Sequence, residues 1–182
     1  MKKIILLSGS LRKGSYATKI AKAVADLFPE GYETKLVNIE DLHFYREDYD
    51  TEEFVDETYI KFREEIEGLD GAIFVTPEYN RSTAPALKNA LDVGSRGNKG
   101  ILWEGVPAAV ISHSTSRLGG FGANHHLRQS LVFFNMPVVQ QPEAYISFSD
   151  TMFDEDGNLI NDDIKNLLQE VVNALIKLIE KN

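Results

Sequence analysis

Three polar segments rich in glycine, serine and asparagine carry the residues whose types could bind a ligand. The first spans residues 9–15, contains Ser10, Arg12 and Ser15, and directly follows an apolar run at residues 4–7. Small residues let a ligand approach the backbone, and hydroxyl and guanidinium groups can donate hydrogen bonds to an anion. A helix that begins at Ser15 would add unpaired N–H groups and a positive dipole end. This combination predicts a phosphate-binding loop.

The spacing within this first loop excludes two common phosphate motifs. Gly9 and Gly14 have the spacing of a Walker A loop, but Ser15 and Tyr16 stand where Lys and Ser or Thr are required. The dinucleotide fingerprint G-x-G-x-x-G also fails, because Leu11 lies two residues after Gly9. A site for a single phosphate therefore remains, and its alternative is an ordinary strand-to-helix turn with exposed basic side chains.

Two further polar segments follow apolar runs in the same way. Residues 77–82 read Pro-Glu-Tyr-Asn-Arg-Ser and follow the run at 71–76, and residues 113–122 follow the run at 106–112. The apolar run at 34–39 has no such segment behind it. In a parallel sheet of the order 2-1-3-4-5, the first, third and fourth strands are neighbours, and ligands bind beyond their carboxyl ends. The three segments are therefore expected to form one site.

The alternation of strand and helix patterns predicts the fold class. Buried strands are typically continuous apolar runs, and helices show apolar residues at a period of 3.6. The pattern predicts a flavodoxin-like three-layer α/β/α sandwich with a five-stranded parallel sheet, as a single domain over residues 1–182. Asp50 with Glu53 resembles a capping box before a helix that contains Phe62. The remaining elements are expected at 15–28 (helix), 86–93 (helix), 123–134 (helix), 137–141 (fifth strand) and from 161 onwards (last helix).

Composition limits the class of protein and its partners. The chain has 182 residues, 43% of them hydrophobic and 26% charged, which is ordinary for a globular domain. A net charge of −9 disfavours nucleic acid as a partner, because phosphate backbones are bound by clustered Lys and Arg. The absence of cysteine excludes disulfides and thiolate chemistry and fits a cytoplasmic protein. No apolar run approaches the roughly 20 residues that a membrane span needs.

The polar segments together resemble those of the NADPH-dependent FMN reductase family, which includes chromate, quinone and azo-dye reductases. The resemblance extends from residue 3 to about residue 146. It rests on the segments 9–15, 77–82 with Pro85, 87–92 with Ser95 and Arg96, and 119–122 followed by 126–129. It implies a flavodoxin-like fold, bound FMN, NADPH or NADH as hydride donor, and a homodimer or homotetramer.

The resemblance also implies which residues contact FMN. The first segment matches the phosphate loop, the second runs along the isoalloxazine ring, and the third lies on the other side of that ring. The matched positions are Ser10, Arg12, Ser15, Tyr16 and Ala17, then Pro77, Glu78, Tyr79, Asn80 and Ser82, then Ser114, Gly119 and Gly120. Family members usually have Asn where this chain has Ala17, so one side-chain contact to the cofactor is missing. Tyr79 is expected to stack on the ring, and the N–H groups of Tyr79 and Asn80 to bond its polar edge.

No protein acid or base is required at the centre of such a site, because the flavin itself accepts the hydride. For Glu78, the residue patterns favour a helix-capping or surface role over proton donation. His113, His125 and His126 lack carboxylates at a matched spacing, so a metal site is not predicted.

These features predict an FMN-dependent NAD(P)H oxidoreductase with ping-pong kinetics that reduces quinones, azo compounds, metal oxyanions or free flavin. One alternative is a flavodoxin-like electron carrier without its own NAD(P)H turnover, which the acidic charge favours to some extent. Another alternative is a regulatory protein that has the fold but lacks FMN.

An oligomer is also expected from the sequence around residues 86–103. The helix predicted at 86–93 has apolar residues over more of its circumference than one buried stripe requires, and Trp103 follows in a segment without strand pattern. An exposed apolar surface of this kind usually marks an interface. Trp103 and this helix are therefore expected at a subunit boundary.

Overall fold

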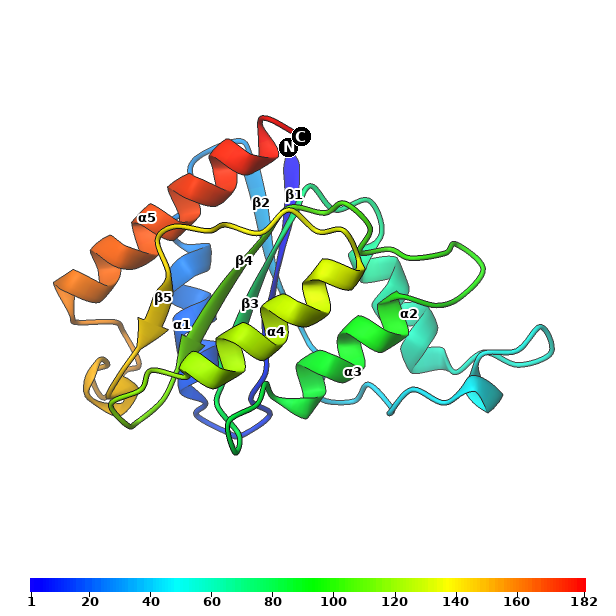
Figure 1. Cartoon of the computed structure of the whole chain (residues 1–182), viewed down its shortest axis with the longest axis horizontal. Helices are drawn as coiled ribbons and strands as arrows, with labels where there is room; N and C mark the ends of the chain where they lie inside the picture. The colour runs from blue at the N-terminus through cyan, green and yellow to red at the C-terminus, as the bar shows by residue number, and fades with distance from the viewer.

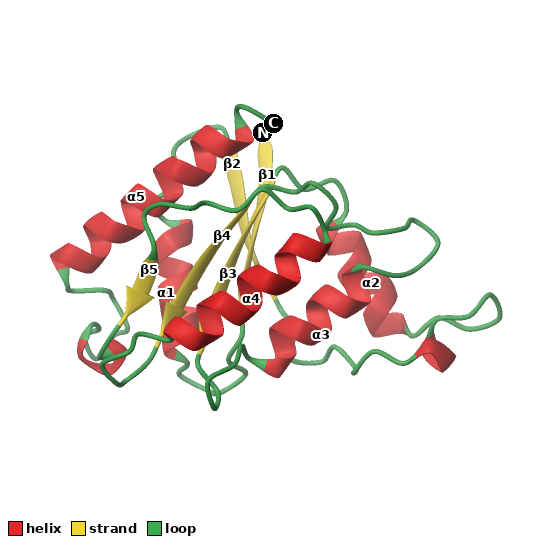
Figure 2. Cartoon of the chain, in the orientation of Figure 1, coloured by secondary structure: helices red, strands yellow, loops and turns green.

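The computed structural model describes all residues from 1 to 182 and contains one five-stranded parallel sheet (Figure 2). The strand order is β2-β1-β3-β4-β5, which confirms the predicted topology. The strands are β1 (Lys2–Ser8), β2 (Tyr32–Val37), β3 (Gly71–Pro77), β4 (Ala108–His113) and β5 (Ala144–Ile146). β1 and β3 are buried over most of their length, as expected for strands covered on both faces.

Helices cover both faces of the sheet, so the predicted three layers are confirmed (Figure 1). One face carries α1 (Tyr16–Ala25) and α5 (Asp162–Ile179), and the other carries α2 (Glu57–Ile66), α3 (Pro85–Gly94) and α4 (Phe121–Phe133). Successive strand residues point to opposite faces. Ile5 and Leu7 of β1 therefore belong to one apolar core, and Ile4 and Leu6 belong to the other.

All five strands run in the same direction, which places the loops after them at one edge of the sheet. The loops that follow β1, β3 and β4 lie together at the lower edge in Figure 1. None of the helices is both long and apolar enough to cross a membrane.

The predicted fifth strand at residues 137–141 is wrong. Val138 forms only an isolated parallel bridge with Ala108, at the start of β4, and β5 follows at Ala144–Ile146. Pro137 and Pro142 flank this stretch and have no N–H group to donate to a sheet. The stretch makes two backbone hydrogen bonds to Ala108, and regular pairing with β4 begins only at Ala144.

The predicted capping box at Asp50 is also wrong. α2 begins at Glu57, and its N-cap is Asp56, whose Oδ1 accepts a hydrogen bond of 2.8 Å from the Thr58 N–H. Asp50 instead binds Arg63 through two hydrogen bonds of 2.8 and 2.7 Å, with both side chains nearly buried. A bidentate pair of this geometry ties the segment before α2 to the helix itself.

Trp103 was predicted to lie at a subunit boundary, but its side chain lies in the core of the chain. Its side chain is completely buried, packs against Phe62 and Phe74, and donates from Nε1 to the Leu91 carbonyl at 3.1 Å. The apolar side chains of α3 are buried in the same core, which explains the wide apolar arc of this helix.

Candidate functional site

The loop between β1 and α1 presents a set of free backbone donors. The N–H groups of residues 10–14, and those of Tyr16 and Ala17, donate to no acceptor within the chain. Within the loop, the N–H of Gly9 donates to the Val75 carbonyl at 2.8 Å and that of Ser15 donates to the Arg12 carbonyl at 3.1 Å. The Ser15 hydroxyl caps α1 by accepting from the Thr18 N–H at 3.3 Å. A loop of unpaired N–H groups at a helix N-terminus has the geometry of an anion site.

Arg12 lies over this loop and adds positive charge to it. Its guanidinium donates to the carbonyls of Lys13 and Gly14, each at 3.2 Å, and lies 5.2 Å from the centre of the Tyr16 ring. A guanidinium has five N–H donors, so further donors remain for a ligand.

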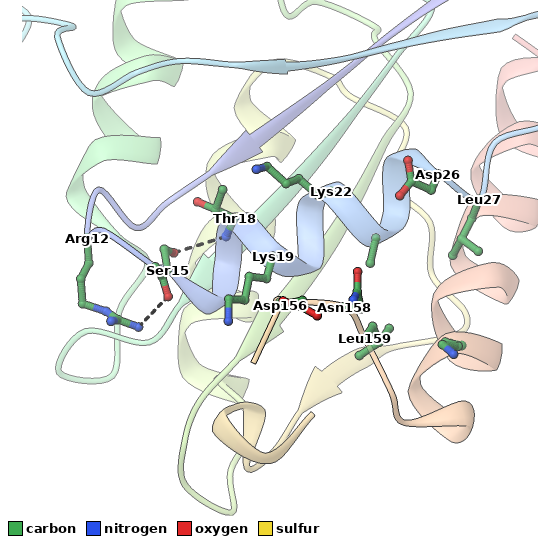
Figure 3. A pocket seen from close by; sticks show the side chains of 14 residues that line it. Arg12, Ser15, Thr18, Lys19, Lys22, Asp26, Leu27, Asp156, Asn158 and Leu159 are labelled. Atoms are coloured by element: carbon green, nitrogen blue, oxygen red, sulfur yellow. Dashed lines mark hydrogen bonds between the residues drawn. The ribbon is translucent and has the colours of Figure 1, made fainter. Parts of the chain in front are cut away.

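A hollow of about 620 Å³ extends from the loop along α1. Figure 3 shows Arg12 and Ser15 at one end of it and Lys19 further along the helix, beside Asp156. Lys19 and Lys22 line the hollow without forming an ion pair. Asp26 and Asp156 also line the hollow, but cationic side chains outnumber them. The local charge therefore favours an anionic ligand, although the chain as a whole carries a charge of −9.

Ala17 contributes only backbone to this region. Its side chain is completely buried in the core between α1 and the sheet. The methyl group therefore cannot face a ligand in the loop, whereas its free N–H group remains a possible donor.

The segment after β3 folds into a tight hairpin turn. Tyr79 and Ser82 exchange two backbone hydrogen bonds of 3.0 Å, and the residues between them, Asn80 and Arg81, have φ angles of 51° and 68°. Two consecutive left-handed residues are the mark of a type I′ turn. The Tyr79 N–H is therefore not available to a ligand, contrary to expectation, whereas the Asn80 N–H has no acceptor within the chain.

Glu78 connects this segment to the beginning of α4. Its Oε2 accepts hydrogen bonds from the N–H groups of Gly122 and Ala123 at 2.8 and 3.2 Å, and Arg81 donates to its Oε1 at 3.1 Å. These contacts confirm the helix-capping role. Pro77, the last residue of β3, pairs with His113 in β4 and places the two segments next to each other.

The segment after β4 requires glycine at two positions. Gly119 and Gly120 have φ angles of 58° and 78°, in the left-handed region. A Cβ atom on Gly119 would lie 2.7 Å from the backbone of Tyr145, and one on Gly120 would lie 2.9 Å from the Cβ of Ser112. Ser114 accepts a 3.1 Å hydrogen bond from the Ser116 N–H, which closes the turn.

His113, which was considered from the sequence only as a metal ligand and was not predicted as one, lies where β4 leads into the third polar segment. The imidazole is buried at the end of β4, its Nδ1 lies 3.0 Å from the Ser149 hydroxyl, and its Nε2 has no hydrogen-bond partner. Burial, together with the charge of Arg12, lowers the pKa of His113 to about 4. The ring is therefore neutral at physiological pH. In the sequence, the feature that could have indicated this role is the position of His113 at the end of a buried apolar run.

Asn89 was also missed. It lies on the buried face of α3, its Oδ1 accepts from the Tyr45 N–H at 2.8 Å, and its Nδ2 donates to the carbonyls of His43 and Leu42 at 3.0 and 3.3 Å. These bonds fix the segment after β2 against α3. A polar residue on an otherwise apolar helix face was the signal for such a role.

Comparisons with known proteins agree with this geometry. The chain is 46% identical to a quinone reductase from Pseudomonas putida, over 98% of this chain and 95% of that protein. It is 37% identical to a 2-hydroxy-1,4-benzoquinone reductase from a Burkholderia species, over 92% of this chain and 90% of that protein. The fold matches the flavoenzyme NAD(P)H:(acceptor) oxidoreductase FerB from Paracoccus denitrificans with a TM-score of 0.89 and 32% identity, covering 100% of this chain and 98% of that one.

The donors of the site fit an FMN phosphate, because free N–H groups, hydroxyls and a guanidinium converge at the start of α1. The family model for NADPH-dependent FMN reductases matches residues 2–151. The chain therefore belongs to the NADPH-dependent FMN reductase family, as an oxidoreductase with a flavodoxin-like fold that uses FMN and NAD(P)H.

Proposed function

We propose that this enzyme reduces quinones with electrons from NAD(P)H. The names of the relatives from Pseudomonas putida and Burkholderia support a quinone as the acceptor. The net reaction transfers a hydride equivalent from NAD(P)H and one proton from water to the quinone, and yields a hydroquinone and NAD(P)⁺. Bound FMN supplies the chemistry by accepting the hydride from the nicotinamide and passing both electrons to the acceptor.

The β1–α1 loop is the proposed site of the FMN phosphate. The observation that carries this assignment is the run of free N–H groups at residues 10–14, 16 and 17, beside the Ser15 hydroxyl and the Arg12 guanidinium. Ser10 lies in the same run. A charged ligand bound there gains hydrogen bonds and the favourable end of the α1 dipole.

The flavin ring is proposed to lie between the hairpin after β3 and the turn after β4. Tyr79 is 44% exposed, so its ring has a free face for stacking, and the free Asn80 N–H can donate to the polar edge of the flavin. On the other side, Gly119 and Gly120 shape the turn after β4, because a Cβ atom at either position would clash with Tyr145 or Ser112. Because Glu78 is already used as a cap, these residues position and shield the flavin rather than exchange protons.

The visible spectrum of the purified protein tests this function directly. We expect a yellow protein, because oxidised flavin absorbs blue light. This absorption band should disappear when NADPH is added in the absence of oxygen, and it should return when a quinone is added. A flavin that NADPH does not bleach, but that chemical reductants do, would instead indicate an electron carrier. A colourless protein that does not take up FMN would refute the assignment.

The remaining parts of the proposal concern assembly and location. The chain is proposed to form one FMN-binding domain, to act in the cytoplasm, and to assemble as a homodimer or homotetramer. The surface that supports assembly is α4, where Val132 and Phe133 are 73% and 71% exposed. Azo compounds, metal oxyanions and free flavin are further acceptors to be tried beside quinones.

A further inference from the structure

A second, largely apolar hollow of about 320 Å³ opens beside the proposed cofactor site. It lies between the β1–α1 loop, the segment after β2 and the hairpin after β3. Its apolar wall includes Leu11, Leu42, Phe44 and Tyr79. We name it the Phe44 pocket.

The backbone that carries Phe44 is fixed by buried polar groups. Asn89 bonds the backbone of Leu42, His43 and Tyr45, as described above. The buried Tyr59 hydroxyl donates to the Phe44 carbonyl at 2.7 Å and accepts from the Arg46 N–H at 3.0 Å. The backbone of each residue from 42 to 46 is therefore hydrogen-bonded to a side chain of α2 or α3.

Although its backbone is fixed, the Phe44 side chain is not packed against the core. It is 70% exposed at the rim of the pocket, and Leu11 on the opposite wall is 46% exposed. An aromatic ring packed in the core would bury most of its surface and gain about 1.5–3 kcal/mol. Exposed apolar groups at the rim of a hollow are the usual lining of a small-molecule site.

The charges and the position of the pocket narrow the class of ligand. Arg12 and Glu40, of opposite sign, both border the pocket, so its charges do not select an ion. Arg12 and Tyr79 belong to the proposed cofactor site as well, so an occupant of the pocket would lie against bound FMN. The volume is at the lower end of the roughly 300–1,000 Å³ typical of ligand sites, which suits one or two fused rings.

We propose that the Phe44 pocket binds the ring of the quinone acceptor and favours uncharged, apolar quinones over hydrophilic oxidants. This inference rests on the proposed quinone reductase function. In this role Phe44 determines specificity: it contacts the acceptor ring and takes no part in reduction of the flavin by NADPH.

The test compares Phe44→Ala with Phe54→Ala. Phe54 is a matched control, because it is an aromatic residue of the same connection and is 54% exposed. It borders a separate hollow that Phe44 also touches, but it does not line the Phe44 pocket. Three quantities are measured for each holoenzyme: the affinity for FMN, the rate of flavin bleaching by NADPH, and the rate of reoxidation by 1,4-naphthoquinone or by ferricyanide.

For Phe44→Ala we expect reoxidation by low concentrations of naphthoquinone to slow by about tenfold or more, the size expected for the loss of an apolar contact in a pocket. Ferricyanide reoxidation, NADPH bleaching and FMN affinity should stay within a factor of two of the wild type, and Phe44→Leu should recover part of the naphthoquinone rate. Phe54→Ala should behave as the wild type in all assays.

Several results would overturn the proposal. An unchanged naphthoquinone rate, or an equal loss with ferricyanide, would show that the pocket does not hold the acceptor. Slower NADPH bleaching would assign it to the nicotinamide, and weaker FMN binding would assign it to the flavin. If NADPH does not bleach the flavin of the wild type, the proposed function fails. The flavin is then reduced with dithionite, and the same reoxidation rates are compared, which tests the pocket independently of NADPH.

Discussion

The Ser82 hydroxyl lies 3.0 Å from Nδ1 of His126, and this pair joins the hairpin after β3 to α4. It supplements the bonds from the N-terminal N–H groups of α4 to Glu78. The hairpin that carries Tyr79 is thus fastened at both of its ends to the same helix. The position of the aromatic ring at the proposed flavin site therefore depends on the N-terminus of α4.

Replacing Glu78 should loosen this connection. Glu78→Ala removes the cap of α4 and should lower the free energy of unfolding by about 1–2 kcal/mol, measured by urea denaturation. Glu78→Gln keeps an oxygen that can accept from the Gly122 N–H and should lose less. Because Glu78 acts as a cap, the pH profile of turnover should be the same in Glu78→Gln and in the wild type. Loss of turnover in a stably folded Glu78→Gln would instead indicate proton transfer.

Arg12 should contribute to the binding of the FMN phosphate and not of the flavin ring. Arg12→Ala removes a charge-assisted hydrogen bond and should weaken FMN binding by about 1.5–3 kcal/mol. Riboflavin, which lacks the phosphate, should bind wild type and variant equally in the same fluorescence titration. Lys13→Ala is the control for a general loss of positive charge. Equal FMN affinities of Arg12→Ala and wild type would contradict the assignment.

Much of the fold could be predicted from the sequence, because its elements follow from local patterns. Continuous apolar runs such as residues 4–7 and 72–75 can be buried only between two helical layers, and the polar segments behind three of them indicated which strands are neighbours. The helix starts expected at residues 15 and 161 are correct, because Ser15 and Asn161 are N-caps, and each accepts from an N–H three residues further along.

The parts that could not be predicted depend on contacts between distant residues. Asp50 fits a capping box by spacing, but its two bonds to Arg63 require the folded arrangement of α2. Trp103 shows no helical or strand pattern and is buried because Phe62 and Phe74 lie next to it in space. The hairpin bond that occupies the Tyr79 N–H arises from two left-handed residues, neither of which is glycine.

Tyr79 should determine the environment of the flavin more than the residues of the phosphate loop do. Its ring is partly exposed at the end of a rigid turn, so Tyr79→Ala should leave the fold intact by circular dichroism. The flavin absorption envelope and the quenching of flavin fluorescence should both change, because aromatic stacking is lost. Tyr79→Phe, which retains the ring, should have the spectrum of the wild type. An unchanged spectrum in Tyr79→Ala would place this side chain away from the ring.

Assembly should be sensitive to the exposed apolar end of α4. We expect the wild type to sediment at micromolar concentration as a species of at least twice the monomer mass of 20.4 kDa. Phe133→Glu places a charge at a position that is 71% exposed in the isolated chain and should shift the protein toward the monomer without unfolding it. A wild type that sediments as a single species of monomer mass would refute the oligomer.

The stability of the fold should fall on mild acidification because of His113. Its pKa is lowered from 6.5 to about 4 by burial and by the charge of Arg12, so the folded protein keeps the ring neutral. Below pH 6.5 the unfolded chain binds a proton at this residue, whereas the folded chain does not until about pH 4. The free energy of unfolding should therefore decrease as the pH falls from 6.5 to 4, by up to about 3 kcal/mol.

His113→Gln isolates this contribution, because glutamine has a similar polar end group and does not titrate. The variant should lose less stability than the wild type between pH 6.5 and 4, as measured by urea denaturation at each pH. Burial alone would raise the pKa of Asp56, but hydrogen bonds from Thr58 and His43 together outweigh it and lower this pKa from 3.8 to about 2. The stability that depends on Asp56 is therefore lost only below pH 3.8, outside the window of His113. Parallel stability profiles of variant and wild type above pH 4 would show that His113 is not held in its neutral form.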